Sequence, residues 1–388
     1  MFNHKSTYHI KSGFLGKYIT FCTYNDHKKG QHGSALIRAD VETGDMLVLA
    51  HSNPGDENHF YSGNAISMVP NSPYLAVPQK NHMALYDIYT SEKIEFPLFS
   101  GKNNPEESWG TPAGTCDGKY LIFPYNDQKL NWNDPEEVRN KQVGHSVYRL
   151  EISSGKLEEV FRDEKSRNNH VIANPVNPDL CLIDRDLPPK FYGKGDDGVT
   201  PRVWILEIST RKVIPVVPRE KSKFAWHSNW NYDGTHVYYH GPSSEISVRK
   251  LFEEKGGKDF INPYPTIISK NHYENQPHFI GVADSNGTPV WEATFPRLVY
   301  GHTGSHSSRD IMYVDNLITD RQVVAIHWRE LNDFGMPLME LAFAHNSYYY
   351  NELQVCHPHC TMSDDAKWMS YNAYMNGRAD VYVAQMQF

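Results

Sequence analysis

The sequence has little of three things that would narrow its function at once: clustered positive charge, long apolar runs and paired cysteines. Its formal net charge is −8 and no block of Lys or Arg stands out. This argues against nucleic acid as the main partner, because phosphate binding needs a basic surface. No apolar run reaches the roughly 18 residues that would suggest a membrane-spanning helix. The five cysteines include no CxxC pair, which argues against a disulfide framework.

The first residues of the chain also lack the apolar segment of a secretory signal peptide. We therefore expect a cytoplasmic protein, or a periplasmic or secreted one whose leader has been removed. Aromatic residues are abundant, at 13% of the chain with 24 Tyr and 8 Trp. Such a composition favours β structure and planar ligands such as sugars.

One sequence pattern recurs along the 388 residues. It is a polar or His-bearing segment, a turn, a short β-rich run and a second run that closes near a TG- or SG-like turn. The equivalent turns fall at positions 16, 71, 117, 179, 233, 310 and 365. Their spacing is that of a β-propeller blade with variable loops. The sequence predicts an all-β fold, a seven-bladed β-propeller that forms a single domain over residues 1–388, each blade a four-stranded antiparallel sheet.

One short helix is expected between positions 127 and 142, with Asp134 or Asn133 as its N-cap and Pro135 at its first position.

Residues just before the first strand of each blade would line the central funnel of such a propeller. One interpretation of the polar residues there is a set of blade-tip caps. Because they are imidazole- and aromatic-rich, we favour a ligand site. We predict substrate contacts from four of these segments: His59, Trp109, His170 and Trp230.

The densest group of candidate metal ligands is Gln354, His357 and His359. In an extended segment, side chains two positions apart share a face, so the two histidines can point the same way. Two imidazoles and an amide oxygen form most of a divalent-metal site. The alternative is a polar loop with two solvated histidines.

These segments resemble the oligogalacturonate lyase family, metal-dependent seven-bladed propellers that cleave uronic-acid oligosaccharides by β-elimination. Gln354-x-x-His357-x-His359 is similar to the family's metal cluster. The matching segments elsewhere are Trp226-His227-Ser228-Asn229-Trp230 with Asp233-Gly234, Arg202-Val203-Trp204, Ser305-His306 and Asn58-His59-Phe60-Tyr61.

The resemblance implies a polysaccharide lyase that uses a divalent metal, Mn²⁺ in the first place and Ca²⁺ as the alternative. It implies that His306 completes the metal site of Gln354, His357 and His359, with His302 as a rival. The implied partner is an oligosaccharide that contains uronic acid.

The resemblance further implies that His227 removes the proton on C5 of the uronate and that Arg202 faces the substrate carboxylate. As a separate hypothesis of ours, Tyr61, or another tyrosine of the funnel, would donate to the leaving oxygen. Arg202 could instead pair with a neighbouring acid.

The chain departs from the family at Asp184-Arg185-Asp186, where the family has His-Glu-Gly. We therefore expect a rebuilt site and keep other uronate linkages open, including those of ulvan and of rhamnose-capped glucuronate side chains. A non-catalytic propeller that binds a glycan or a protein is the main rival class.

Overall fold

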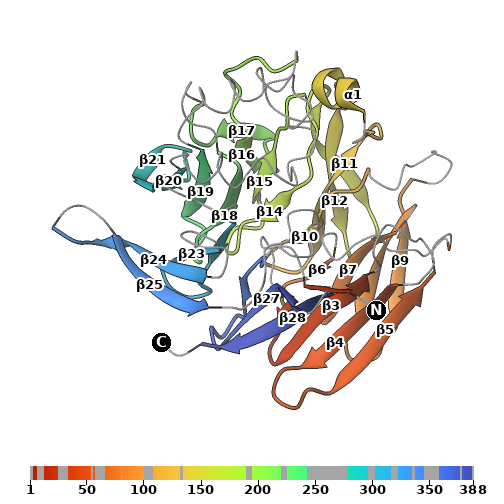
Figure 1. Ribbon diagram of the computed structural model, residues 1–388. Helices are drawn as coiled ribbons and strands as arrows, with labels where there is room; N and C mark the ends of the chain where they lie inside the picture. The colour runs from red at the N-terminus through yellow and green to blue at the C-terminus, as the bar shows by residue number, and fades with distance from the viewer. Residues whose placement is uncertain are drawn as a thin grey trace.

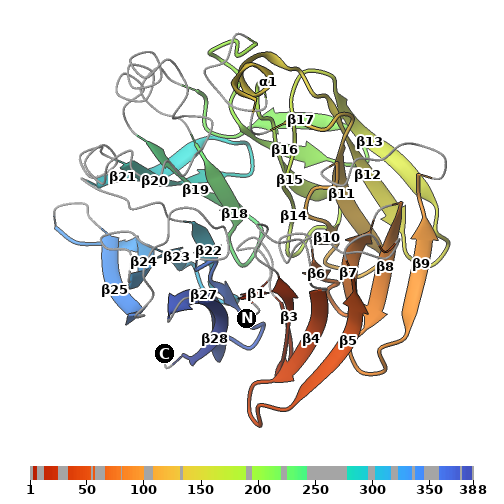
Figure 2. The ribbon, with the colours of Figure 1, turned by 45° about the vertical axis from the view of Figure 1, so that its right-hand side comes forward.

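The computed structural model describes residues 3–6, 13–24, 34–53, 56, 66–79, 81–99, 108–131, 134–188, 195–219, 225–242, 278–295, 302–315, 322–333, 337–344, 358–375 and 378–386. In these residues the chain forms seven antiparallel sheets that follow one another along the sequence. Figure 2 shows them around a common middle, with β6, β10, β14, β18 and β22 innermost and β5, β9 and β13 at the perimeter. The predicted seven-bladed β-propeller is confirmed.

The first four sheets contain strands β1 to β17. Blade 1 comprises β1 (Asn3–Ser6), β2 (Phe14–Leu15), β3 (Tyr18–Tyr24), β4 (Ser34–Asp40) and β5 (Met46–Ser52), and blade 2 comprises β6 (Ser67–Met68), β7 (Tyr74–Gln79), β8 (His82–Asp87) and β9 (Lys93–Pro97). Blade 3 comprises β10 (Ala113–Gly114), β11 (Tyr120–Asn126), β12 (His145–Glu151) and β13 (Leu157–Asp163), and blade 4 comprises β14 (Val171–Ala173), β15 (Leu180–Asp184), β16 (Val203–Glu207) and β17 (Lys212–Pro215).

The last three sheets contain β18 to β28. Blade 5 comprises β18 (His227–Trp230), β19 (His236–Pro242), β20 (His278–Asp284) and β21 (Pro289–Phe295), and blade 6 comprises β22 (Thr303–Ser305), β23 (Met312–Asp315), β24 (Gln322–Leu331) and β25 (Pro337–Ala344). Blade 7 comprises β26 (Thr361–Met362), β27 (Trp368–Met375) and β28 (Arg378–Gln385).

Blades 2 to 6 have the predicted four strands each, and the first and last blades differ within the described residues. In blade 1, β1 pairs with one half of β3 and β2 with the other half, so the two share the place of one inner strand. Blade 7 shows three strands in the part of the chain that the structure describes.

Each of the seven predicted turn positions lies in the connection between two consecutive strands of one blade, from β2 and β3 in blade 1 to β26 and β27 in blade 7. The turn at Gly234 shows why the position is restricted. Its φ of +68° lies in the left-handed region that favours glycine, and a Cβ there would collide with the side-chain amide of Asn174 in blade 4. Asn174 Nδ2 donates to the carbonyl oxygen of Gly234 at 2.8 Å, so this turn docks blade 5 onto blade 4.

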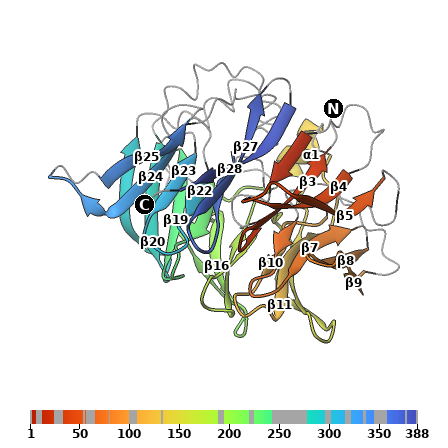
Figure 3. The same cartoon turned by 90° about the horizontal axis from the view of Figure 1, so that it is seen from below.

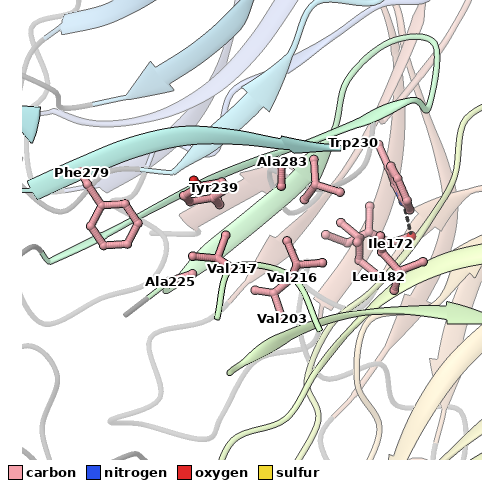
Figure 4. Close-up of a cluster of buried hydrophobic side chains, with 12 residues drawn as sticks. Ile172, Leu182, Val203, Val216, Val217, Ala225, Trp230, Tyr239, Phe279 and Ala283 are labelled. Carbon is pink, nitrogen blue, oxygen red and sulfur yellow. Dashed lines mark hydrogen bonds between the residues drawn. The ribbon is translucent and has the colours of Figure 1, made fainter. Parts of the chain in front are cut away.

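The core lies between the blades. Each pair of neighbouring blades encloses one cluster of buried apolar side chains among the described residues. Figure 4 shows the cluster between blades 4 and 5, where Val203 and Leu182 of one blade meet Tyr239 and Trp230 of the next. A blade is a sheet with two apolar faces, and it can bury both only between two neighbours.

The ring closes between its first and last blades. Phe14, Ile19 and Phe21 of blade 1 pack against Trp368 and Val383 of blade 7. Figure 3 shows β28 beside the strands of blade 1, and β1 contacts β28. Closure covers sheet faces that would otherwise be exposed.

The short helix α1 (Pro135–Asn140) is also confirmed, at the edge of the molecule in Figure 1. Asp134 is its N-cap, and the carboxylate accepts from the backbone N–H groups of Glu136 and Glu137. Within the described residues, no helix has the length and apolar character needed to cross a membrane.

Truncating a core residue between blades should destabilise the whole ring. Leu85 is fully buried in the cluster between blades 2 and 3, so Leu85→Ala should lower the free energy of unfolding by about 2–5 kcal/mol. Leu341, which is 57% exposed, provides the matched control, and Leu341→Ala should cost less than about 0.5 kcal/mol. Urea denaturation followed by tryptophan fluorescence measures both; equal losses in the two variants would contradict the packing described.

His145 should make stability depend on pH. Burial lowers the pKa of His145 to about 4, so between pH 6.5 and 4 the unfolded chain binds the extra proton. The stabilisation is therefore complete above pH 6.5 and is lost as the pH falls through this window. His145→Asn can keep an N–H donor for Ser166 O, which lies 3.0 Å from the His145 Nδ1 atom, and removes the titration.

Urea denaturation from pH 7 to pH 4 should show a smaller loss of stability in His145→Asn than in the wild type, by up to about 3 kcal/mol. The exposed His51 gives the control His51→Asn, which should follow the wild-type pH dependence. An unchanged slope in His145→Asn would show that His145 is not held neutral by the fold.

Candidate functional site

Four histidines from four successive blades form a row at the inner strands. His170 directly precedes β14, His227 begins β18, His302 directly precedes β22 and His359 lies two residues before β26. The ring centroids of His170 and His227 are 6.5 Å apart, those of His227 and His302 are 4.7 Å apart, and those of His302 and His359 are 4.5 Å apart. The structure thus brings together imidazoles that are up to 189 positions apart in the sequence.

Behind each histidine of this row lies a polar residue of the second strand of the same blade. The strand register sets Asp184 opposite the His170 position, His240 opposite His227, Asp315 opposite the His302 position and Asn372 opposite the His359 position. All four are buried. Asp184 was noted in the sequence only as part of the segment that departs from the resembling family, and the other three were not singled out. A signal was present, since each of the four lies 13 or 14 positions after its histidine.

Asp315 fixes two members of the row. Its Oδ1 atom accepts from the backbone N–H of His302 at 2.5 Å, and its Oδ2 atom accepts from the backbone N–H of His359 at 3.1 Å. Oδ2 also lies 3.3 Å from Nδ1 of His302. His359 has φ +48°, a left-handed conformation that few non-glycine residues adopt. One buried carboxylate therefore ties blades 6 and 7 together and orients their histidines.

Arg202 lies in a buried chain of charges in blade 4. Its Nη2 atom is 2.7 Å from Asp184 Oδ2, and its Nε atom is 2.7 Å from Asp186 Oδ1. Asp184 Oδ2 is in turn 2.5 Å from Nδ1 of His170. Burial raises the pKa of Asp186, and the charge of Arg202 opposes that shift.

The sequence left two roles open for Arg202, contact with a substrate carboxylate or pairing with a neighbouring acid. The structure shows Arg202 paired with neighbouring acids. Two carboxylates already neutralise its guanidinium, which makes it a support for Asp184 and His170. Asp184 and Asp186 are the residues that stand where the resembling family has another motif, so the departure lies within the site itself.

His227 has a histidine as its support. Its Nδ1 atom lies 3.1 Å from Nε2 of His240. Burial, together with the positive charges near it, holds the pKa of His240 well below its usual range, so His240 is neutral.

The structure does not bring His306 into the row. His306 follows β22 and His302 precedes it, so the strand separates them by about 13 Å. The His306 ring stacks on Tyr313 at 6.1 Å, and Nδ1 accepts from the backbone N–H of Ser308 at 3.0 Å. Burial lowers its pKa to about 4. Of the two rivals, His302 is the one beside His359.

Of the two tryptophans predicted to bind substrate, Trp230 is buried in the core and Trp109 is partly buried against the cluster between blades 2 and 3. Trp230 is 2% exposed in the core between blades 4 and 5, and its indole N–H donates to Ile172 O at 3.1 Å (Figure 4). It faces away from the row because it lies three residues beyond His227, on the opposite face of β18. Trp109 packs among Phe99, Phe123 and Tyr125. His59, Tyr61, Gln354 and His357 lie outside the described residues.

A divalent cation suits the donors at one end of the row. His302 and His359 are two buried imidazoles in contact, and the carboxylate beside Nδ1 of His302 is a common support for a metal-binding histidine. The described residues alone do not complete a site, since no three His, Cys, Asp or Glu side chains among them are placed to hold an ion. Gln354 and His357 are the remaining candidates.

Comparisons with known proteins agree with this fold. No family model matches the chain, and no curated protein matches it by sequence. Its structure is similar to that of an oligogalacturonate lyase in complex with manganese, with a TM-score of 0.69 and 14% identity over 100% of this chain and 91% of that one. It is also similar to an oligogalacturonate lyase from Vibrio parahaemolyticus, with a TM-score of 0.69 and 15% identity over 99% of this chain and 91% of that one.

A hydrazine synthase from Kuenenia stuttgartiensis has a TM-score of 0.59 and 11% identity over 98% of this chain and 95% of that one. At such low identities the likeness shows a shared propeller fold. The fold is thus used by proteins of different activity, and the case for a function depends on the site.

Removing one oxygen acceptor from Asp315 should weaken the junction of blades 6 and 7. Asp315→Asn places an N–H₂ group against one of the backbone N–H groups that the carboxylate now accepts from, at a cost of about 1–3 kcal/mol of stability. The surface carboxylate of Asp87 accepts the N–H groups of Tyr89 and Thr90 through one oxygen. Asp87→Asn can keep both bonds and is the matched control.

The measurement is the urea midpoint of each variant at constant m-value. Asp315→Asn should lower the midpoint clearly, whereas Asp87→Asn should change the stability by less than about 0.5 kcal/mol. Equal midpoints for Asp315→Asn and the wild type would mean that the carboxylate does not hold the two histidines.

Proposed function

We propose that this protein is a propeller lyase that cleaves a 4-linked uronic-acid oligosaccharide by β-elimination and releases an unsaturated uronate. The observation that carries the proposal is the row of His170, His227, His302 and His359, which four blades bring to one place. The similarity of the whole chain to oligogalacturonate lyase structures supports it.

The chemistry of elimination explains why such a row is suitable. The proton on C5 of a uronate is weakly acidic, and removing it places negative charge on the adjacent carboxylate. A site must therefore supply a base and must stabilise that charge. Imidazole is well matched to proton transfer near neutral pH. The alternative, glycoside hydrolysis, would need a pair of carboxylates that flank the scissile bond, one on each side. Asp184 and Asp186 are both paired with Arg202, which disfavours this role for them.

His302 and His359 would hold a divalent cation together with Gln354 and His357, with Mn²⁺ as the first choice and Ca²⁺ as the alternative. Such a cation, when bound, supplies positive charge at the substrate carboxylate. Asp315 holds the two described histidines in position. Arg202 acts by holding Asp184, which holds His170.

The linkage that is cleaved need not be that of oligogalacturonate. Asp184 and Asp186 replace the family motif beside the row, so glucuronate linkages, including those of ulvan and of rhamnose-capped side chains, belong in the first screen. The experiment incubates the protein with galacturonate and glucuronate oligosaccharides, and it follows the ultraviolet absorbance of the new double bond together with the product masses.

We expect an unsaturated product, loss of its formation in chelator and recovery with Mn²⁺. His302→Ala and His359→Ala should each reduce turnover by about 10²–10³-fold and should lose bound metal, measured by elemental analysis after dialysis. His306→Ala removes a buried imidazole of the same blade and should keep its metal.

Products that carry an added water would identify a hydrolase. Binding of an oligosaccharide with no product would identify a glycan-binding propeller. Metal loss in His306→Ala with retention in His302→Ala would return the ligand role to His306.

A further inference from the structure

His170 and His227 are adjacent in the row, yet their Nδ1 atoms have chemically different partners. Nδ1 of His170 faces a carboxylate oxygen of Asp184. Nδ1 of His227 faces a ring nitrogen of His240. Because the partner of one ring nitrogen determines where a neutral imidazole carries its hydrogen, these contacts specify the tautomer of each residue.

Asp184 determines the tautomer of His170. Its Oδ2 atom also accepts from Arg202 Nη2 at 2.7 Å, which is the contact of a carboxylate oxygen that acts as an acceptor. A nitrogen 2.5 Å away must therefore carry the hydrogen itself. Arg202 Nη2 lies 3.5 Å from the same nitrogen, too far to compete. Neutral His170 thus has its hydrogen on Nδ1 and its lone pair on Nε2.

His240 determines the tautomer of His227 in the opposite sense. The 3.1 Å contact between His227 Nδ1 and His240 Nε2 needs one hydrogen. Nδ1 of His240 is buried and has no hydrogen-bond partner in the part of the chain that the structure describes. A buried N–H without a partner is less tolerable than a lone pair without one. His240 therefore carries its hydrogen on Nε2 and donates it to His227.

His227 then accepts at Nδ1, so its own hydrogen lies on Nε2. We infer that His170, through Nε2, is the proton acceptor of the site, and that His227, through its Nε2–H, is a hydrogen-bond donor to a substrate oxygen on which negative charge develops. The inference rests on the proposed lyase function and reverses the sequence-based prediction that His227 is the base.

The proposed step balances as follows. The C5–H bond breaks and its proton goes to Nε2 of His170. The electron pair forms the double bond between C4 and C5, and the bond from C4 to the leaving oxygen breaks. That oxygen takes a proton from solvent, and His170 returns its proton to solvent. His227 keeps its hydrogen throughout, in the manner of a neutral histidine that polarises a substrate.

Nuclear magnetic resonance tests the tautomers directly, without substrate. The full chain is labelled with ¹⁵N-histidine, and two-bond correlations between ring hydrogens and ring nitrogens report which nitrogen is protonated. Signals are assigned by their loss in His170→Gln and His227→Gln. We expect hydrogen on Nδ1 in His170 and on Nε2 in His227. The reverse pattern, or the same tautomer in both, would overturn the inference even if the protein is an active lyase.

Turnover of a uronate oligosaccharide that the wild type cleaves provides the second test. A glutamine amide can donate from the place of Nε2 but cannot act as a base near neutral pH. His170→Gln should therefore lose about 10²–10⁴-fold in turnover, and so should His170→Asn, which can keep the bond to Asp184. His227→Gln should lose about tenfold, and His227→Ala at least tenfold more.

If His227→Gln is as inactive as His227→Ala while His170→Gln retains turnover, His227 is the base and the inference is wrong. If the wild type cleaves no uronate but the two tautomers are as stated, the proposed lyase function fails while the assignment of the two imidazoles stands. Circular dichroism confirms that each variant is folded.

Discussion

The packing of one blade against the next is the constraint on which the rest of the structure depends. Each sheet buries its apolar faces only between two neighbours, and among the described residues every junction has its own cluster, from Leu36 and Ile66 between blades 1 and 2 to Phe14 and Trp368 at the closure. Because the ring closes, the starts of the inner strands converge. This convergence places His170 and His359 in one row, a proximity that the sequence alone does not provide.

The polar residues behind that row illustrate how a propeller keeps such a site rigid. A buried polar group must be hydrogen-bonded, and a satisfied buried network restricts its members to one arrangement. Asp315 satisfies the backbone of two blades with one carboxylate. Asp184 joins His170 to Arg202. The residue opposite the histidine on the second strand of a blade thus both stabilises the fold and orients that histidine.

The charge of Arg202 shows how a local departure alters a site. Taken from the sequence alone, an arginine directly before a blade strand could pair with a substrate carboxylate, as Arg202 before β16 was predicted to do. Asp184 and Asp186 are part of the protein and lie 2.7 Å from the guanidinium nitrogens of Arg202, so they neutralise its charge without a substrate. In the proposed lyase, the stabilisation of charge on a substrate would then come from the imidazole row and from a cation held with the help of His302 and His359. The proposed substrate class follows from this row more than from Arg202.

The repeat spacing, the turns and the short helix α1 with Pro135 at its first position were all predictable from the sequence, because these features depend on short-range geometry; the structure chose Asp134 over Asn133 as the N-cap. The recurrence of histidines before inner strands was predictable for the same reason. Only the tertiary structure decided that His302 and not His306 adjoins His359, and that Trp230 is core. The place of His302 depends on which end of β22 faces the centre of the ring, and that of Trp230 on which face of β18 is covered. The packing of the neighbouring blades determines both. The nitrogen that each imidazole presents also depends on a partner 13 or 14 positions away, across a strand pair whose register only the folded sheet fixes.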